Sequence, residues 1–422
     1  TWRTKKARGH GCGSMMFGML RGHEHGVMMS DAGPIRFTYQ QLVMSTRNFS
    51  EFLGEGAFGK VYKGRLLVVT AKGRKADEKE LPVAVKVLKN GTMGAGPEEA
   101  EKQFRAEVRT LGNIHHNNLV NLLGYCIGGR GLDMKILVYE FVENGSLSEF
   151  LSEEKEPLPW AVRYSIAVGT ARGIAYLHHD CKPHILHCDI KPENVLLDHE
   201  FTAKVADFGL ARRLEEVKSN LLMMSGARGT RGYMAPEWLK TAEITSKADV
   251  YSYGIVLLKL VRGFHERGND DESLVDWAYK FISSNQDGEH KEPSISNGPE
   301  EEDSLKKEEH PNGQIQEHEL DNLDIPKAEQ EPRGVKSDKH DEEENLEKIR
   351  VLKIGLWSVQ YQPESRPSML RILQLFEGIG DDIGIPPYPA PPSAVLVGYE
   401  SSSTSTNMQS CMENSDVIFS AR

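Results

Sequence analysis

A glycine-rich turn followed by a strand lysine and a helix glutamate most constrains what this chain can fold into. Residues 54–61 read GEGAFGKV, which matches G-x-G-x-x-G-x-V and alone is a weak signal, because glycine turns recur in many folds. The stretch VAVK, which ends in Lys86, then follows on the predicted strand LPVAVKVLK, and the predicted helix PEEAEKQFRAEVRTLGNI carries Glu107. Glycines allow close backbone approach to phosphates, and Glu107 would fix the Lys86 ammonium as their counter-charge. This order predicts a nucleotide site built on strands and one helix.

A second set of polar residues follows in the helical part of the chain. Residues 187–194 read HCDIKPEN, so that Asp189 and Asn194 lie five positions apart, and Asp207 follows in the stretch ADFG. The stretch APE ends at Glu237. Carboxylate and carboxamide oxygens suit a hard cation such as Mg²⁺ and do not suit zinc.

These six motifs, in this order, resemble those of the eukaryotic protein kinases over residues 52–378. Stretches such as LVYEFVENGSLSEFL, HCDIKPENVLLD and GLWSVQYQPESRPSM are most similar to plant receptor-like kinases whose ectodomains are S-domain (G-type) lectins. The resemblance implies an α+β, bilobal kinase fold. The β-rich small lobe would span residues 35–142 and the mainly helical large lobe residues 143–378.

The resemblance also implies a role for each motif residue. Asp189 would accept the proton of the substrate hydroxyl, and Lys191 would offset charge beside the γ-phosphate. Asn194 and Asp207 would hold Mg²⁺, with Mn²⁺ as the alternative ion. Tyr139 would lie at the back of the adenine pocket, next to the hinge. The residues expected to bind ATP are Gly54, Glu55, Gly56, Ala57, Phe58, Gly59, Val61, Ala84, Lys86, Glu107, Tyr139, Glu140 and Val142.

Substrate choice and switching are expected to depend on the residues around Asp189. Lys191 and Thr230, the latter in GTRGYMAPE, favour serine/threonine over tyrosine specificity. Cys188 stands where many kinases have an Arg that pairs with a phosphate on the activation segment, so the chain resembles the non-RD kinases. The Asp189 carboxylate should remain available for catalysis, whereas the cation that would pair with a phosphorylated activation segment is missing. That segment spans residues 207–237, and its candidate hydroxyls are Ser219, Ser225 and Thr230.

The chain departs from the family pattern at one position and keeps a family ion pair at another. Lys259 follows YGIVLL where these kinases usually have Glu, which would alter a local ion pair. Glu237 and Arg366 are both present, so the salt bridge that the family makes between the APE carboxylate and a late Arg is expected here.

Three segments outside the lobes have compositions that do not build a core. Residues 1–34 form a basic, juxtamembrane-like leader, which is either disordered or held against an anionic membrane surface. The insert at about 286–345 is expected to be disordered, because residues 287–344 contain 20 acidic and 7 basic residues. It is read as either a tolerated expansion or a docking segment for a basic partner. Residues 379–422 form a Pro/Ser-rich tail that is also expected to be disordered.

The expected function is transfer of the ATP γ-phosphoryl to serine and threonine hydroxyls of proteins, in signal transduction. The alternative is a catalytically weak, pseudokinase-like scaffold. The five cysteines have no CxxC spacing, which argues against a disulfide framework or a zinc site. The partners are protein substrates and a second copy of the chain for autophosphorylation, and no nucleic acid is expected. The chain begins with Thr, so a membrane span upstream would place it at the cytosolic face of the plasma membrane; otherwise it is cytoplasmic.

Overall fold

The structure, a computed structural model, describes twelve stretches of the chain, and its contacts divide them into two compact units. The first unit comprises the described residues up to Gly145 together with 196–200 and 204–212, and the second comprises the rest. The division after Gly145 lies close to the lobe boundary expected at residue 142. The described stretches are 33–56, 59–72, 75–89, 97–112, 114–128, 134–153, 155–214, 229–239, 244–263, 272–286, 335–379 and 383–389.

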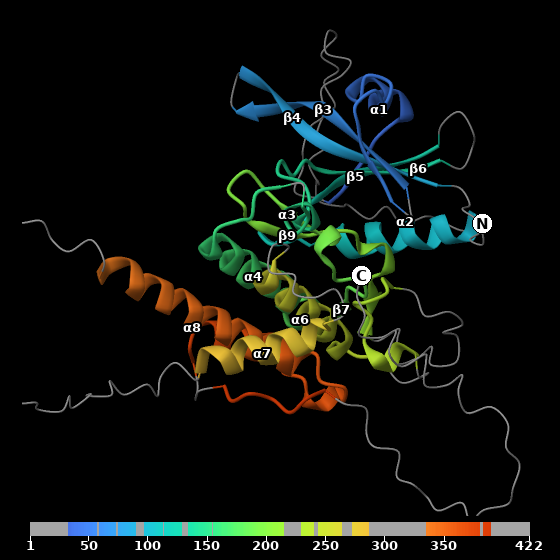
Figure 1. The fold of residues 1–422 in the computed structure, drawn as a ribbon. Helices are drawn as coiled ribbons and strands as arrows, with labels where there is room; N and C mark the ends of the chain where they lie inside the picture. The colour runs from blue at the N-terminus through green and yellow to red at the C-terminus, as the bar shows by residue number, and fades with distance from the viewer. Residues whose placement is uncertain are drawn as a thin grey trace, which may run out of the picture. The chain divides into compact units, whose positions relative to one another are not determined.

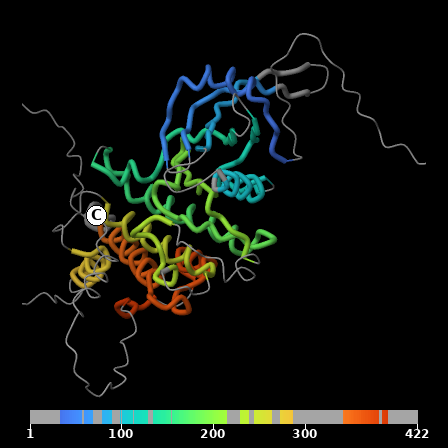
Figure 2. The backbone as a smooth tube through the Cα atoms, turned by 90° about the vertical axis from the view of Figure 1, so that its right-hand side faces the viewer, coloured from blue at the N-terminus to red at the C-terminus, as the bar shows by residue number. Residues whose placement is uncertain are grey.

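A six-stranded sheet forms the body of the first unit, in the order β1-β5-β6-β4-β3-β2 (Figure 1). Only the β1–β5 pair is parallel. In Figure 2, α2 (cyan) lies on one side of these strands, and it contacts β5 and β6. The elements are β1 (Ile35–Arg36), α1 (Tyr39–Ser45), β2 (Phe52–Glu55), β3 (Gly59–Lys72), β4 (Lys75–Leu88), α2 (Pro97–Leu111), β5 (Leu122–Ile127) and β6 (Lys135–Glu140).

A long hairpin joins the glycine-rich turn to the strand that carries Lys86. β3 and β4 pair continuously from Gly59↔Leu88 to Lys72↔Lys75. Because successive side chains of a strand point to opposite faces, Val83 and Val85 enter the core of this unit while Lys86 faces the other side.

The residues before the glycine-rich turn complete the sheet and its core. Thr38 caps α1, accepting from the backbone N–H of Gln41, while the Gln41 side chain accepts from the N–H of Thr38. Phe37, just before this cap, is buried in the core. Beside it, Ile35 pairs with Gly124 of β5.

Replacing Gly124 by Ala should destabilise the first unit by about 1–3 kcal/mol, as overpacking of a tight core does. An added Cβ would lie 2.2 Å from the Ile35 carbonyl oxygen and 2.4 Å from Phe37 Cε2, so β1 would have to move. Urea unfolding followed by fluorescence measures the loss. Gly54→Ala is the matched control, since its Cβ would meet nothing within 4 Å. Equal stability of the two variants would contradict this account.

The second unit is mainly helical, and its longer helices pack against one another. α6 contacts α4, α7 and α8, and α9 contacts α4 and α8. The helices are α3 (Leu147–Phe150), α4 (Trp160–Ala175), α6 (Lys247–Arg262), α7 (Leu274–Gln286), α8 (Val335–Ser358) and α9 (Met369–Phe376). The chain also has short elements, of which η3 and most of β8 and β9 belong to the first unit. They are the π-helical turn η1 (Tyr176–Asp180), the 3-10 turns η2 (Pro192–Asn194), η3 (Phe208–Leu210), η4 (Pro236–Leu239) and η6 (Pro363–Ser365), and the strands β7 (Ile185–Leu186), β8 (Val195–Leu197), β9 (Ala203–Val205) and β10 (Arg212–Arg213).

The insert expected at about 286–345 is shorter than predicted at its C-terminal end. α8 begins at Val335, so residues 335–345 are helical, and residues 287–334 lie outside the described part of the chain. The charged residues at this end are good helix formers, and Glu344 pairs with Lys348 one turn later at 2.9 Å. One turn of α8 is also tied to α4, because Trp160 Nε1 donates to Glu347 Oε2 at 2.9 Å.

Part of the tail expected to be disordered is packed. Residues 383–389 lie against α7 and α8, and both Pro386 and Pro389 are buried. The prediction failed because this segment is held through its backbone carbonyls, which composition does not reveal. Residues 1–32 of the leader expected at 1–34, and the part of the tail after residue 389, lie outside the described residues.

Candidate active site

The first unit brings together the lysine and the two carboxylates selected from the sequence. Lys86 Nζ on β4 lies 2.9 Å from Glu107 Oε1 on α2 and 2.7 Å from Asp207 Oδ1, which precedes η3. Glu107 is fully buried, and the Asp207 side chain remains 24% exposed. Asp207 adopts a left-handed backbone conformation with φ of 64°. The lysine is therefore a fixed cation between two anions, of which only Asp207 is open to solvent.

Tyr139 adds a contact that the sequence did not predict. Its hydroxyl donates a hydrogen bond to Glu107 Oε2. Desolvation by burial raises the pKa of Glu107 to about 7, against the attraction of Lys86. Burial opposes the charge of Lys86 as well, but Asp207 and Glu107 outweigh it and raise the pKa of that ammonium. Lys86 thus favours the ionised form of Glu107, and burial opposes it.

The described part of the glycine-rich turn is tightened by backbone and charged contacts. Gly56 N–H donates to the Gly59 carbonyl at 2.9 Å, and Lys89 Nζ lies 2.6 Å from Glu55 Oε1. A Cβ on Gly59 would lie 2.4 Å from the Val87 carbonyl oxygen, so this position requires glycine. The remaining members pair across strands, Val61 with Lys86 and Ala84 with Tyr139, while Ala57 and Phe58 lie outside the described residues.

The expected hinge begins where β6 ends, at Glu140. Its carboxylate accepts from the Asn121 N–H at 2.9 Å and pairs with Lys204 at 3.1 Å, while its own N–H donates to the Asn121 carbonyl. Val142 is buried. These contacts fix the backbone at residue 140 within the first unit.

The second unit brings together four of the residues chosen from the sequence, around Asp189. Thr230 Oγ1 donates to Asp189 Oδ1 at 2.8 Å, and Asn194 Nδ2 donates to Asp189 Oδ2 at 3.0 Å and to its backbone carbonyl at 2.8 Å. Lys191 Nζ lies 2.8 Å from Asp189 Oδ2 and 2.7 Å from Thr230 Oγ1. One carboxylate oxygen thus already holds an aliphatic hydroxyl, while a cation and an amide hold the other. Ser219 and Ser225 lie outside the described residues.

Two residues that sequence reasoning missed hold the backbone before Asp189. Asp249 on α6 accepts the N–H groups of His187 and Cys188 at 2.8 Å each, and His178 Nε2 lies 2.8 Å from the same carboxylate. Burial opposes ionisation of Asp249, but these hydrogen bonds hold its pKa below the usual value. Cys188 itself adopts φ of 68°. The available signal was the single acidic residue in the largely apolar helix KADVYSYGIVLLKLV.

Comparison with known families decides the class of this molecule. The family described as protein tyrosine and serine/threonine kinase matches residues 48–275, which is more than half of the 422 residues. This chain belongs to the protein kinase family. The expected bilobal α+β kinase fold is confirmed, with strands in the first unit and helices in the second.

Relatives of this kinase include plant receptor-like serine/threonine kinases, as expected. The G-type lectin S-receptor-like serine/threonine-protein kinase At1g34300 of Arabidopsis thaliana is 41% identical, over 92% of this chain and 40% of the relative. SD2-5 of Arabidopsis thaliana is 39% identical, over 86% of this chain and 37% of the relative. LECRK3 of Oryza sativa subsp. indica is 37% identical, over 86% of this chain and 37% of the relative. The chain thus spans about two fifths of the length of these relatives. Among the described residues, no helix combines the length and apolarity needed to cross a membrane.

The residues expected to hold Mg²⁺ are of a suitable chemical type. Asn194 has a carboxamide oxygen and Asp207 has carboxylate oxygens, and oxygen ligands of this kind are the ones that Mg²⁺ prefers.

The one departure and the one retained ion pair noted in the sequence both have structural outcomes. Lys259 Nζ lies 3.1 Å from the Tyr233 hydroxyl and 4.7 Å from the centre of its ring, so a cation–π contact stands where the family usually has a carboxylate. The predicted pair of Glu237 and Arg366 is confirmed as a bidentate contact, with distances of 2.6 and 2.8 Å.

Proposed function

We propose that this kinase transfers the γ-phosphoryl of ATP to serine and threonine hydroxyls of proteins, its own chain included. The arrangement around Asp189 carries this proposal. Its carboxylate already accepts a hydrogen bond from the Thr230 hydroxyl, which is the same chemical group that a substrate serine or threonine would present. A substrate hydroxyl held in this way would lose its proton to Asp189 as its oxygen attacks.

The remaining residues position phosphates rather than react. Lys86, held by Glu107, supplies a fixed positive charge for phosphate oxygens, and Lys191 supplies a second one beside Asp189. We assign Asn194 and Asp207 to hold Mg²⁺, with Mn²⁺ as the alternative. The ion, when bound, neutralises charge that develops on the phosphates. We assign the adenine edge to the backbone of Glu140–Val142. Since Lys86, Asp189, Asn194 and Asp207 are all present, a pseudokinase-like scaffold is not favoured.

The biological setting is also proposed. By analogy with its relatives, this kinase acts as the cytosolic signalling part of a receptor at the plasma membrane. The basic residues 1–34 would contact anionic lipids there. Two copies would meet for autophosphorylation. Because Cys188 cannot pair with a phosphate as Arg does, activity would depend little on phosphorylation of Ser219 and Ser225.

The direct test is to incubate the purified chain with Mg-ATP labelled in the γ-position. We expect label in the chain itself and in a serine/threonine substrate such as myelin basic protein, with phosphoserine and phosphothreonine recovered after acid hydrolysis. Phosphotyrosine alone would contradict the assigned specificity. A folded chain that binds Mg-ATP without transferring label would contradict the catalytic proposal.

Tyr139→Phe should shift the acid limb of the pH–activity profile to higher pH. Removing the hydroxyl takes away a donor to the ionised form of Glu107, so the pKa of that carboxyl should rise above about 7. A hydrogen bond to a charged group is worth about 1.5–3 kcal/mol, or roughly one to two pKa units. Lys86 would then lose its anchor at a higher pH.

The measurement is kcat/KM between pH 6 and 9, with the variant approaching wild-type activity at the alkaline end. Tyr164→Phe is the matched control, because its hydroxyl donates to the Phe376 carbonyl in the second unit. Superimposable profiles for wild type and Tyr139→Phe would show that Tyr139 does not support Glu107.

A further inference from the structure

Residues 383–389, here called the strap, lie against α7 and α8 without forming a helix or strand. Pro386 and Pro389 are buried and Ile383 is half-buried, so every third residue faces the helices. A period of three residues per turn is that of the polyproline II helix. The intervening residues Gly384, Ile385, Pro387 and Tyr388 are exposed.

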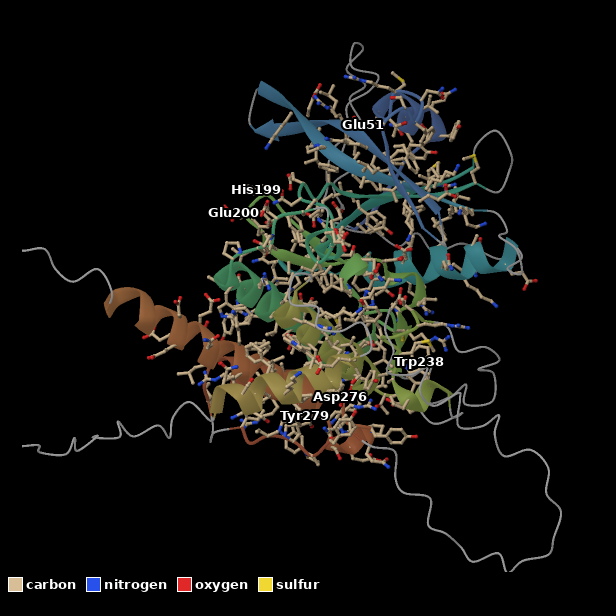
Figure 3. All side chains as sticks on the ribbon, in the orientation of Figure 1. Glu51, His199, Glu200, Trp238, Asp276 and Tyr279 are labelled. Carbon is tan, nitrogen blue, oxygen red and sulfur yellow. The ribbon has the colours of Figure 1, made fainter. Side chains whose placement is uncertain are left out.

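Three side chains of the second unit, here called the strap site, hold the strap. They are Tyr279 on α7, labelled in Figure 3, Trp357 in the last turn of α8, and Gln360 two residues beyond the end of that helix. α7 and α8 contact each other and lie side by side in Figure 1. The hydrogen bonds run from the Tyr279 hydroxyl to the carbonyls of Pro386 and Pro387 at 2.9 Å each, from Trp357 Nε1 to that of Gly384 at 3.0 Å, and from Gln360 Nε2 to that of Pro387 at 3.0 Å.

The chemistry of these contacts is that of a receptor for proline-rich segments. A polyproline II helix makes no internal hydrogen bonds, so its carbonyls are free to accept from a partner. Domains that bind such segments do so with aromatic-lined surfaces. Here two aromatic side chains donate to the carbonyls, and the ring of Tyr279 also contacts Tyr388, with centroids 5.6 Å apart. The strap site therefore binds backbone carbonyls and proline rings, and other proline-rich segments have both.

We propose that the strap site is a binding site for proline-rich segments in the polyproline II conformation, and that the chain's own strap occupies it as an intramolecular ligand. A proline-rich segment of another protein, with prolines three residues apart and an aromatic residue before the second, takes the place of the strap. This inference is independent of the proposed phosphoryl transfer.

The strap is covalently connected to its own binding site, and this connection determines how readily a partner segment can replace it. A short connection presents an intramolecular ligand at an effective concentration of the order of millimolar. A partner with micromolar affinity for the free site must therefore compete with the strap. Ile385 and Tyr388 are 41% and 50% exposed, so the strap is held on one side only and can leave without opening the helical core.

The test uses the full chain with the strap unseated by Pro386→Asp and Pro389→Asp, since burying a carboxylate at these positions is unfavourable. The probe is a fluorescein-labelled peptide of residues 383–392, IGIPPYPAPP, and binding is followed by anisotropy. The unseated chain should bind the peptide at least about tenfold more tightly than wild type, because the competing strap is gone. Adding Tyr279→Phe should weaken this binding, whereas the matched Tyr164→Phe should not. A control peptide carrying Asp at both proline positions should not bind.

Equal affinity for wild type and the unseated chain would overturn the proposal, as would no binding by an unseated chain whose thermal unfolding matches wild type. Should the double substitution impair folding, a protease site placed between residues 378 and 383 allows the connection to be cut after folding. The cut chain should then bind the peptide more tightly than the uncut chain. Sedimentation should show wild type as a monomer; a dimer that is lost in the unseated chain would assign the site to a second copy instead.

Discussion

Phosphate incorporation by the Asp189→Asn chain should fall by about 10²–10⁴-fold, the range typical of losing a general base. The amide cannot take the hydroxyl proton, although it has nearly the same shape. Its oxygen can still accept from Asn194, and its NH2 group can donate to the Thr230 hydroxyl oxygen in place of the bond that Asp189 accepts. Asp207→Ala should cause a comparable loss, because it removes an assigned Mg²⁺ ligand and one partner of Lys86. The measurement is the initial rate of label transfer from γ-labelled Mg-ATP.

The control for both variants is Asp180→Asn, which changes an exposed carboxylate of η1 and should leave the rate unchanged. Thermal unfolding of each variant shows whether the fold is intact. Retention of more than about a tenth of wild-type activity, a loss below roughly 1.4 kcal/mol, would contradict the role assigned to the residue.

The chain with Arg366→Ala should lose about 3–5 kcal/mol of stability, the cost of removing one partner of a buried ion pair. The change leaves the buried Glu237 carboxylate without its bidentate partner. It also removes donors from three backbone carbonyls and a cation from the face of Tyr251. Those carbonyls belong to Lys247, Gln360 and Tyr361. Urea unfolding followed by circular dichroism measures the loss.

Two further arginine variants make this prediction specific. Arg366→Lys keeps the charge but not the planar fork of donors, so it should recover only part of the stability. Arg371→Ala is the matched control on α9, where the exposed side chain contacts only Gln374 and the Ile379 carbonyl among the hydrogen bonds described. Its effect should stay within about 0.5 kcal/mol. Similar losses for Arg366→Ala and Arg371→Ala would show that burial of the pair is not what stabilises the second unit.

Much of the site could be predicted from sequence because its residues are fixed by local motifs. Lys86 and Glu107 were selected from a glycine turn, a strand and a helix, and the structure places them 2.9 Å apart. Asp189, Lys191 and Asn194 lie within one short stretch, so their proximity follows from the chain itself.

What could not be predicted depends on residues distant in sequence whose side chains give no signal of their own. Asp249 accepts a backbone hydrogen bond from a loop that lies 61 residues earlier in the chain, and nothing in the sequence of its helix predicts that partner. The strap escaped prediction for a different reason, since Pro386 and Pro387 contribute carbonyls that every sequence has. The start of α8 at Val335 could not be predicted, because its charged residues are compatible with both a solvated helix and a disordered insert.

The way Asp249 holds the catalytic loop bears on how such an enzyme can diverge. The carboxylate grips the backbone N–H groups of His187 and Cys188, and every amino acid except proline supplies such a group. Position 188 can therefore exchange its side chain over evolutionary time while the neighbouring Asp189 keeps its place. The contacts that fix the position of Asp189 are thus separate from the side chain that would pair with a phosphorylated activation segment, so regulation can change at position 188 while the catalytic geometry is kept.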